Sequence, residues 1–315
     1  MIWLTWRQHR LEGLITLGVL VLLGVFLLLT GRAMATSFAQ LGLGHCLGQT
    51  SPGSPCPELI MAFGTQYGLL QLFDTLLIFL PLLLGALVGA PLVAREVEQR
   101  THLLVWTQSI TRLRWLTVQL ALVLLAGLLA SGALLAVLIW WYHPWAQLDG
   151  SFGTNAYDTS GPVWVAETLL ALALGVLAGT LTRRVVPAIF LTVALFVGIR
   201  VPVASFWRPY FQAPITQTNR IGQENNNQPT LSNQDWIISQ GYIDAQGNKH
   251  DDLLNCTTNN QTAVQCFQVN GVQGIFVNYQ PADRFWTFQW IETGIYVAFS
   301  LLALGAAFWL VRRLN

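Results

Sequence analysis

Charge is scarce in this sequence. Only 10% of the 315 residues are Asp, Glu, Lys or Arg, whereas 53% are hydrophobic and 13 are Trp. The mean hydropathy is +0.50. A water-soluble domain rarely combines so little charge with apolar runs of eighteen or more residues. The scarcity of charge therefore predicts an integral membrane protein.

Lysine is almost absent, since Lys249 in "GNKH" is the only one. A nucleotide-binding P-loop needs a lysine after a glycine-rich turn to reach the β- and γ-phosphates, so this chain is not expected to hydrolyse ATP by that route. The histidines show no His-x-x-x-His pair or zinc spacing, and no Gly-x-Ser-x-Gly motif is present. We predict no catalytic residue, no metal site and no cofactor bound by this chain.

Long apolar runs are abundant, and six of them approach the roughly 20 residues needed to cross a bilayer. A backbone exposed to lipid must satisfy its own hydrogen bonds, so each run should be a helix. Pro81 should kink the second helix, and glycines inside runs such as "LLLGALVGA" and "LALGVLAGT" indicate close helix packing. The fold expected is all-α, with six transmembrane helices at about Gly13–Thr30, Thr75–Ala94, Trp115–Trp141, Val163–Leu181, Val185–Phe206 and Trp286–Val311.

The basic residues predict the orientation. Ten of the sixteen fall in tails or short connections on one side of the predicted helices, and the positive-inside rule places that side in the cytoplasm. Both termini should then be cytoplasmic. The net charge of +1 argues against nucleic acid as a partner. The ten residues are Arg7, Arg10, Arg95, Arg100, Arg112, Arg114, Arg183, Arg184, Arg312 and Arg313.

The expected organisation has three parts. Residues 1–206 hold the first five helices, residues 207–285 form an external polar subdomain, and residues 286–315 form the sixth helix with a cytoplasmic tail. All four cysteines fall on the external, oxidising side, which suggests two disulfides. The sequence allows three connectivities. We favour Cys46–Cys56 and Cys256–Cys266, because each pair closes a short local loop and the second would staple the external subdomain.

A few ionisable residues lie inside or at the outer edges of the predicted spans, where a charge normally has a partner or an aqueous path. Glu167 is sixteen residues before Arg183, and Arg200 is sixteen residues after Arg184. At about 1.5 Å per residue, Glu167 and Arg200 both lie roughly 24 Å from the turn. We therefore predict an intramembrane ion pair between them, with a structural rather than a transport role. Heads more than about 6 Å apart would contradict it.

Two other acids suggest a possible external vestibule. Asp74 shares a helical face with Gln71 and Tyr67, and Glu292 lies near the outer end of the last span. These side chains could line a vestibule. Ordinary solvation at the membrane interface explains them equally well.

The stretch "AREVEQRTHLLVWTQS", residues 94–109, concentrates charge directly behind the second span. It could form a short helix along the membrane with Glu96, Glu98, Arg100 and Thr101 facing the cytosol, a surface suited to docking a soluble partner. Considered by its residues alone, the stretch is better explained as a solvated cap on the second span.

The same stretch resembles the permease subunits of type-2 ATP-binding-cassette (ABC) exporters. Those proteins carry a Glu-x-Glu-x-x-Thr motif directly after the second span, which here runs from Glu96 through Glu98 to Thr101. The resemblance extends to "MIWLTWRQHR", to "GAPLVAREVEQRTHLLVWTQSITRLRW", to "GTLTRRVVPA" and to the six-span layout. Arg100 departs from the pattern, because many members have Gly there. The external segment is also longer and richer in Asn than in the family, so nothing is carried over for it.

The resemblance implies a coupling helix near residues 95–110, with Glu96, Glu98, Arg100 and Thr101 as contacts to an ABC ATPase. Two copies of the chain would work with two separate ATPase subunits, which bind ATP and Mg²⁺, in the cell membrane of a bacterium. The cargo would be amphipathic or hydrophobic, such as a drug, lipid or peptide. Two alternatives remain: a membrane sensor or immunity protein that binds a compound without transport, and an ion-coupled secondary transporter using Asp74, Glu167 and Glu292.

Overall fold

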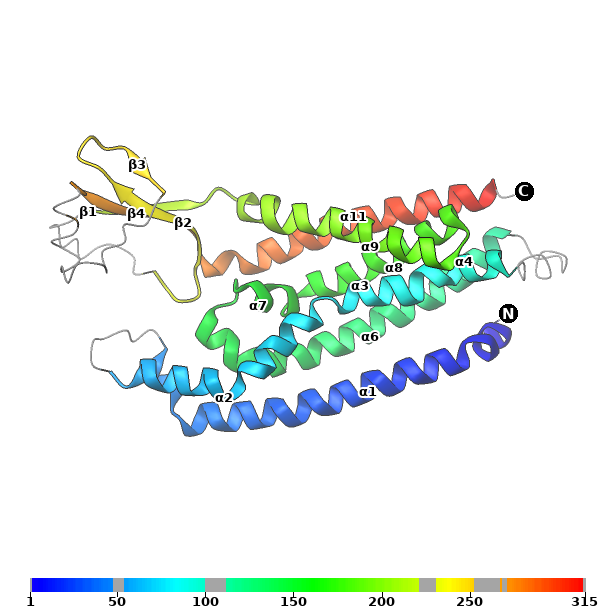
Figure 1. The fold of residues 1–315 in the computed structure, drawn as a ribbon, viewed down its shortest axis with the longest axis horizontal. Coiled ribbons are helices and arrows are strands. Elements are labelled where there is room, and N and C mark those ends of the chain that lie inside the picture. Colours follow the sequence, from blue (N-terminus) through cyan, green and yellow to red (C-terminus); the bar gives the residue numbers. More distant parts are fainter. Residues whose placement is uncertain are drawn as a thin grey trace.

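The computed structural model describes residues 2–47, 54–99, 112–220, 231–251, 267 and 271–313. It is an elongated bundle of helices with a small β-sheet at one end (Figure 1). Both chain termini lie at the opposite end of the bundle (Figure 1). We call these two ends the sheet end and the terminal end.

The helices are long, as expected for membrane-crossing segments. The principal ones are α1 (Ile2–Gln40), α2 (Cys56–Leu77), α3 (Leu80–Leu84), α4 (Ala90–Glu98), α6 (Arg112–Asp149), α7 (Thr154–Thr159), α8 (Pro162–Thr182), α9 (Val185–Pro202) and α11 (Phe285–Arg312). Shorter turns are η1 (Leu43–Cys46), η2 (Gly85–Gly89), η3 (Val203–Trp207), η4 (Arg208–Tyr210) and η5 (Ala282–Arg284). α8 is the central helix, because α3, η2, α4, α6, α9 and α11 all pack against it.

Among the described residues, six helical segments are long and apolar enough to cross a membrane, which confirms the six predicted spans. They are Leu17–Gln40, Leu80–Glu98, Leu113–Asp149, Pro162–Thr182, Val185–Tyr210 and Ala282–Arg312. The protein is therefore a multi-pass membrane protein.

The helix is interrupted just before Pro81, where a kink is predicted. α2 ends at Leu77 and α3 begins at Leu80, so Pro81 lies in the first turn of a new helix. There its missing N–H costs no intrahelical hydrogen bond. A π-helical turn, η2, follows directly and joins α3 to α4.

Glycines allow η2 and α4 to cross α8 at very short distance. A Cβ added at Gly89 would lie 2.8 Å from the Leu172 carbonyl oxygen, and one at Gly179 would lie 2.6 Å from the Ala90 carbonyl oxygen. Such distances are shorter than van der Waals contact. The backbones approach this closely because the glycines have no side chain, which confirms the packing role predicted for both apolar glycine runs.

The sheet corrects the expectation of an all-α fold. Four antiparallel strands follow the order β1-β4-β2-β3, with bounds Ile215–Arg220 (β1), Trp236–Ile243 (β2), Lys249–His250 (β3) and Gly274–Gln280 (β4). The β2–β4 register shifts between Ile237 and Ser239. The strands were missed because short apolar runs such as "GIFVNY" stand among Asn, Gln and Thr, and strand formation there depends on pairing with distant segments.

Aromatic side chains join the sheet to the bundle. Phe152, after α6, stacks on Trp236 of β2 with ring centroids 5.6 Å apart, and it meets Phe288 of α11 edge-on at 5.6 Å. Phe211, before β1, also contacts Phe288. We call Phe152, Phe211, Trp236 and Phe288 the aromatic joint. It fixes the sheet on the end of α11.

The Cys46–Cys56 disulfide is present and confirms the first predicted pairing. It links η1 to the first residue of α2 and so closes the connection between α1 and α2. The second predicted pair, Cys256 with Cys266, lies outside the described residues.

Candidate functional site

An ion pair lies inside the bundle near the sheet end. Arg200 Nε of α9 donates to Glu167 Oε1 of α8 at 2.7 Å. This is the pair that the spacing of the α8–α9 hairpin predicts, and the distance is far below the limit of about 6 Å set for it. The two helices meet at equal depth on either side of their turn.

The pair belongs to a larger cluster of charges. Arg208 donates through Nε and Nη2 to both carboxylate oxygens of Glu292, at 2.8 and 2.7 Å, and through Nη2 to Asp158 Oδ1 at 2.8 Å. Arg200 Nη2 donates to Asp158 Oδ2. Asp158, Glu167, Arg200, Arg208 and Glu292 form what we call the charge network.

Two aromatic residues complete its surroundings. Tyr296 Oη donates to Glu292 Oε1 at 2.9 Å, and the Arg208 guanidinium lies over the Tyr157 ring at 4.1 Å from its centroid. Both contacts favour charged partners in a site shielded from water.

Sequence reasoning missed Asp158 and Arg208. Asp158 lies in α7, within what reads as a polar loop, and Arg208 follows the apolar part of the fifth span. A charge balance gives the signal that was overlooked. The sequence predicts three acids near the outer ends of the spans but only one arginine, Arg200; the acids are Asp74, Glu167 and Glu292. Three buried acids need more than one positive charge for compensation.

The predicted vestibule is wrong for two of its residues. Asp74 and Glu292 are both fully buried, so neither lines an open vestibule nor lies solvated at an interface. Glu292 is instead bound by Arg208. Gln71 donates to Asp149 Oδ2 at 3.5 Å, and the Tyr67 hydroxyl donates to the Ala33 carbonyl oxygen at 3.1 Å, a contact between α2 and α1.

Asp74 is a strongly perturbed acid. It lies in α2, before the span that begins at Leu80. Burial raises the pKa of its carboxyl group to about 7, the Asn155 side chain partly lowers it, and the negative charge of Asp158 raises it further. At neutral pH a substantial fraction of Asp74 is therefore protonated.

The acidic motif lies at the terminal end, where α4 stops. Glu96 Oε1 accepts a hydrogen bond from Gln119 Nε2 of α6 at 2.7 Å, and Glu98 Oε2 accepts one from the backbone N–H of Val185, the first residue of α9, at 3.0 Å. The expectation that both acids simply face the cytosol is wrong for Glu96, which is half-buried and directed toward α6. Arg100 and Thr101 lie outside the described residues.

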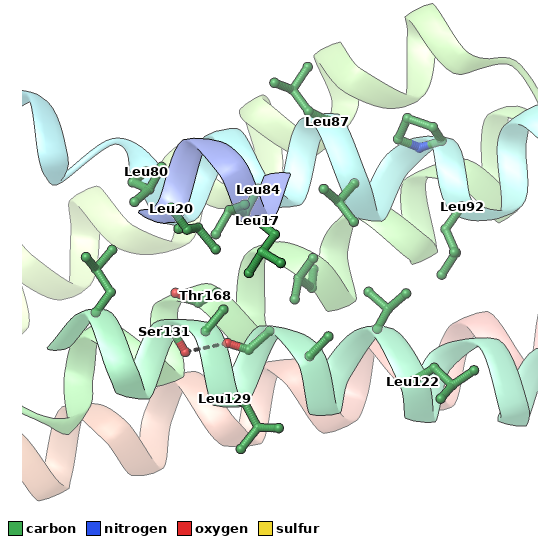
Figure 2. A pocket seen from close by; sticks show the side chains of 18 of the residues that line it. Leu17, Leu20, Leu80, Leu84, Leu87, Leu92, Leu122, Leu129, Ser131 and Thr168 are labelled. Carbon is green, nitrogen blue, oxygen red and sulfur yellow. Dashed lines mark hydrogen bonds between the residues drawn. The ribbon is translucent and has the colours of Figure 1, made fainter. Parts of the chain in front are cut away.

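A large apolar cavity lies between α1 and the rest of the bundle. Its volume is about 1550 Å³, and it opens to the outside along one side. Figure 2 shows lining residues Leu80, Leu84 and Leu92 from the α3–α4 segment and Leu122, Leu129 and Ser131 from α6. The lining extends from Leu80 to Gln99, about 28 Å of helix at about 1.5 Å per residue. That length is close to the roughly 30 Å hydrocarbon core.

The cavity offers few polar groups along its length. The Ser131 hydroxyl donates to the Gly127 carbonyl oxygen at 2.6 Å, and the Thr168 hydroxyl to the Trp164 carbonyl oxygen at 3.0 Å. Both are satisfied within their own helices. Arg95, Glu98 and Gln99 line only the terminal end of the cavity. The arrangement suits a long apolar molecule with a polar group at one end.

The six apolar helices define a multi-pass membrane protein. The model of the family described as "ABC-2 membrane transporter related" matches residues 17–208, and the chain belongs to this family. No curated protein and no solved structure matches it. The matched range runs from α1 to η4 and contains all of the charge network except Glu292, whereas every strand of the sheet lies outside it.

Family membership confirms the resemblance to ABC permeases. The chain is a membrane subunit of a transport system, and members of this kind generally act with an ABC ATPase.

Proposed function

We propose that this chain is the permease subunit of an ATP-driven ABC exporter, working as a homodimer with two separate ATPase subunits. The family match over residues 17–208 carries this proposal. ATP and Mg²⁺ are bound by the ATPase subunits, and this chain converts their closure into movement of its helices.

The position of the acidic motif supports the coupling part of the proposal. Glu96 links the end of α4 to α6, and Glu98 links it to the start of α9. Both helices cross the membrane, so a displacement of the end of α4 would be transmitted to them through these two hydrogen bonds. A coupling segment that begins there and continues through residues 100–110 is well connected for this task.

The orientation follows from charge. Arginines gather where α4 ends, where α6 begins, at the α8–α9 turn and at the end of α11, all at the terminal end (Figure 1). The positive-inside rule makes this end cytoplasmic and the sheet external. The protein then lies in the cell membrane, with its sheet on the side where Cys46 and Cys56 are oxidised.

The apolar cavity indicates the class of cargo. Its walls offer hydrophobic contact over a length close to that of the bilayer core, and its charged residues, Arg95 and Glu98, lie at the terminal end. An amphipathic or hydrophobic molecule, such as a lipid, drug or lipophilic peptide, fits this distribution. Outward movement would begin from the inner leaflet.

The test is partner capture combined with transport. The chain is purified from membranes with its ATPase, and the Glu96→Ala, Glu98→Ala double variant is compared with the natural chain. We expect the variant to insert normally but to lose ATPase co-purification and ATP-dependent efflux.

Gln119→Ala is the matched control, because it removes the bundle partner of Glu96 without changing the acidic motif. It should retain the ATPase. Unchanged ATPase association and efflux in the double variant would refute the docking role, and compound binding without any flux would favour a sensor.

A further inference from the structure

The charge network does not balance. It contains three carboxylates, from Asp158, Glu167 and Glu292, and two guanidinium groups, from Arg200 and Arg208. Arginine stays protonated at all ordinary pH values. With every acid ionised, the network would hold a net charge of −1. An uncompensated charge at a buried position is strongly destabilising.

The hydrogen bonds show where the excess charge lies. Both oxygens of Asp158 accept from arginines, and so do both oxygens of Glu292. Glu167 uses only Oε1, for Arg200. Its Oε2 is buried and has no hydrogen-bond partner among the described residues. Glu167 is therefore the least compensated carboxylate of the three.

We propose that the charge network is a proton-binding site and that Glu167 carries the proton. The step is a simple equilibrium, in which the Glu167 carboxylate takes a proton from water to become a carboxylic acid and returns it when it ionises. Protonation brings the network to neutrality, because two guanidinium groups then face two carboxylates. A neutral O–H without a partner costs less than an ionised oxygen without one.

A metal ion fits this place poorly. One carboxylate oxygen each from Asp158, Glu167 and Glu292 lies within 4.8 Å of the others, a spacing compatible with ion binding. However, guanidinium groups already occupy five of the six carboxylate oxygens. A cation would lie beside two fixed positive charges and would find a single free carboxylate oxygen in the network, Glu167 Oε2, which is too few for a coordination shell. A proton needs no coordination shell.

The groups around Glu167 come from several elements. α7 contributes Asp158 and Tyr157, α9 contributes Arg200, and η4 contributes Arg208. α11 contributes Glu292 and Tyr296. From α2, Asp74 lies near Asp158 and adds further negative charge when ionised. The α3–η2 segment packed against α8, residues 80–89, carries no titratable side chain.

One member of the network reaches the surface of the bundle. The Arg200 side chain is 19% exposed, whereas those of Glu167 and Glu292 are 0% exposed. We expect proton exchange on the side of the network where Arg200 is exposed. The network connects α7, α8, α9, η4 and α11. Loss of the proton should therefore weaken the contacts between these elements, so that the stability of the bundle depends on pH.

The experiment uses the full chain in lipid nanodiscs with Asp74→Asn as background, since Asp74 is a buried acid outside the charge network. Infrared difference spectra recorded between about pH 5 and about pH 9 should show the C=O stretch of a protonated carboxylic acid that disappears as the pH rises. Adding Glu167→Gln should abolish this band. Absence of the band at every pH, or its persistence in the Glu167→Gln variant, overturns the proposal without any need for stability data.

Thermal unfolding supplies a second readout. A group that holds its proton more tightly in the folded state stabilises most at low pH and loses that effect as the pH rises. The melting temperature of the background chain should therefore fall over this range, and that of the Glu167→Gln variant should not. Glu292→Gln is the matched control, which should lower the melting temperature at every pH because it replaces one of the two oxygens that accept from Arg208 with an NH2 donor.

Two results would contradict the assignment. One is a Glu167→Gln variant destabilised at all pH values as strongly as Glu292→Gln, the behaviour of an ordinary ion pair. The other is a melting temperature that changes when sodium replaces N-methylglucamine at fixed pH, since that would make the ligand a metal cation.

Discussion

The Glu98 carboxylate lies where a negative charge stabilises a helix start. Its Oε2 accepts from the backbone N–H of Val185, one of the N–H groups that α9 cannot satisfy internally. The partial positive charge of the helix N-terminus also favours the carboxylate. A residue remote in sequence thus replaces the usual local cap, and the end of α4 becomes attached to α9.

Removal of this cap should be measurable. We expect Glu98→Ala to lower the free energy of unfolding by about 1 kcal/mol, the usual effect of losing a helix cap. Glu98→Gln, which keeps an acceptor, should lose less. The measurement is thermal or denaturant unfolding in detergent, with Gln99→Ala, an exposed neighbour, as the control. Equal stability of Glu98→Ala and the natural chain would contradict a capping role.

Asp74 makes stability depend on pH. Burial raises the pKa of its carboxyl from 3.8 to about 7, so the folded chain holds a proton that the unfolded chain has already lost. Stability from this group is therefore greatest below about pH 4 and falls as the pH rises to about 7. Asp74→Asn should remove the dependence and, near pH 8, stabilise the protein by up to about 4 kcal/mol.

Unfolding of both chains across this pH range tests the prediction. Glu58→Gln, an exposed acid on the same helix, serves as the control and should leave the pH profile unchanged. An Asp74→Asn chain that is less stable than the natural one near pH 8 would show that the ionised carboxylate is needed for folding.

At the scale of elements, the contact of α8 with η2 and α4 holds the centre of the bundle. Gly85, Gly89, Gly175 and Gly179 recur at a spacing of four on each side of this crossing. Small residues at this spacing let membrane helices approach closely and gain van der Waals contact. The crossing tolerates no added atom without a shift of backbone.

Addition of a single methyl group should therefore affect stability differently at different glycines. Gly179→Ala places a Cβ against the Ala90 carbonyl oxygen and should destabilise the protein by about 1–3 kcal/mol, the cost of overpacking. Gly198→Ala meets nothing within 4 Å and should be neutral or slightly stabilising. Thermal unfolding of the two variants in detergent decides the matter, and equal effects would refute the packing argument.

These elements differ in how far the sequence predicts them. The six spans, the break at Pro81 and the Glu167–Arg200 pair follow from apolar length, ring geometry and helix rise, which are local or single-helix properties. The strands, Arg208 and the inward direction of Glu96 do not, because each depends on a partner remote in sequence. Gln119 donates a hydrogen bond to Glu96, and no sequence pattern around Gln119 predicts this contact.

At the scale of the molecule, the aromatic joint holds the sheet against the helical bundle. Trp236 reaches Phe152 and Phe288 from β2, whereas its neighbour Ile237 is 46% exposed on the other face of the strand. Trp236 is also the β2 residue that packs against the apolar cluster of α8, α9 and α11.

Trp236→Ala should loosen the sheet without unfolding the helices. We expect a loss of about 2 kcal/mol, below the roughly 3–5 kcal/mol of a fully buried Trp because this ring is only half-buried. Limited proteolysis should then cut within residues 231–251 faster than in the natural chain. Ile237→Ala should leave the cleavage rate nearly unchanged, and equal rates for all three chains would refute the joint.

The β1–β4 ladder has a mechanical consequence. β1 follows α9 through η3 and η4, β4 leads into α11 through η5, and the two strands pair over six residues from Ile215–Tyr279 to Arg220–Gly274. The paired strands hold the outer ends of α9 and α11 together and prevent these helices from sliding past one another. In the described part of the chain, α1 packs chiefly on α6, and the Cys46–Cys56 disulfide ties its outer end to α2 rather than to α9 or α11. Opening of the bundle should therefore proceed as a swing of α1 away from a rigid α8–α9–α11 body.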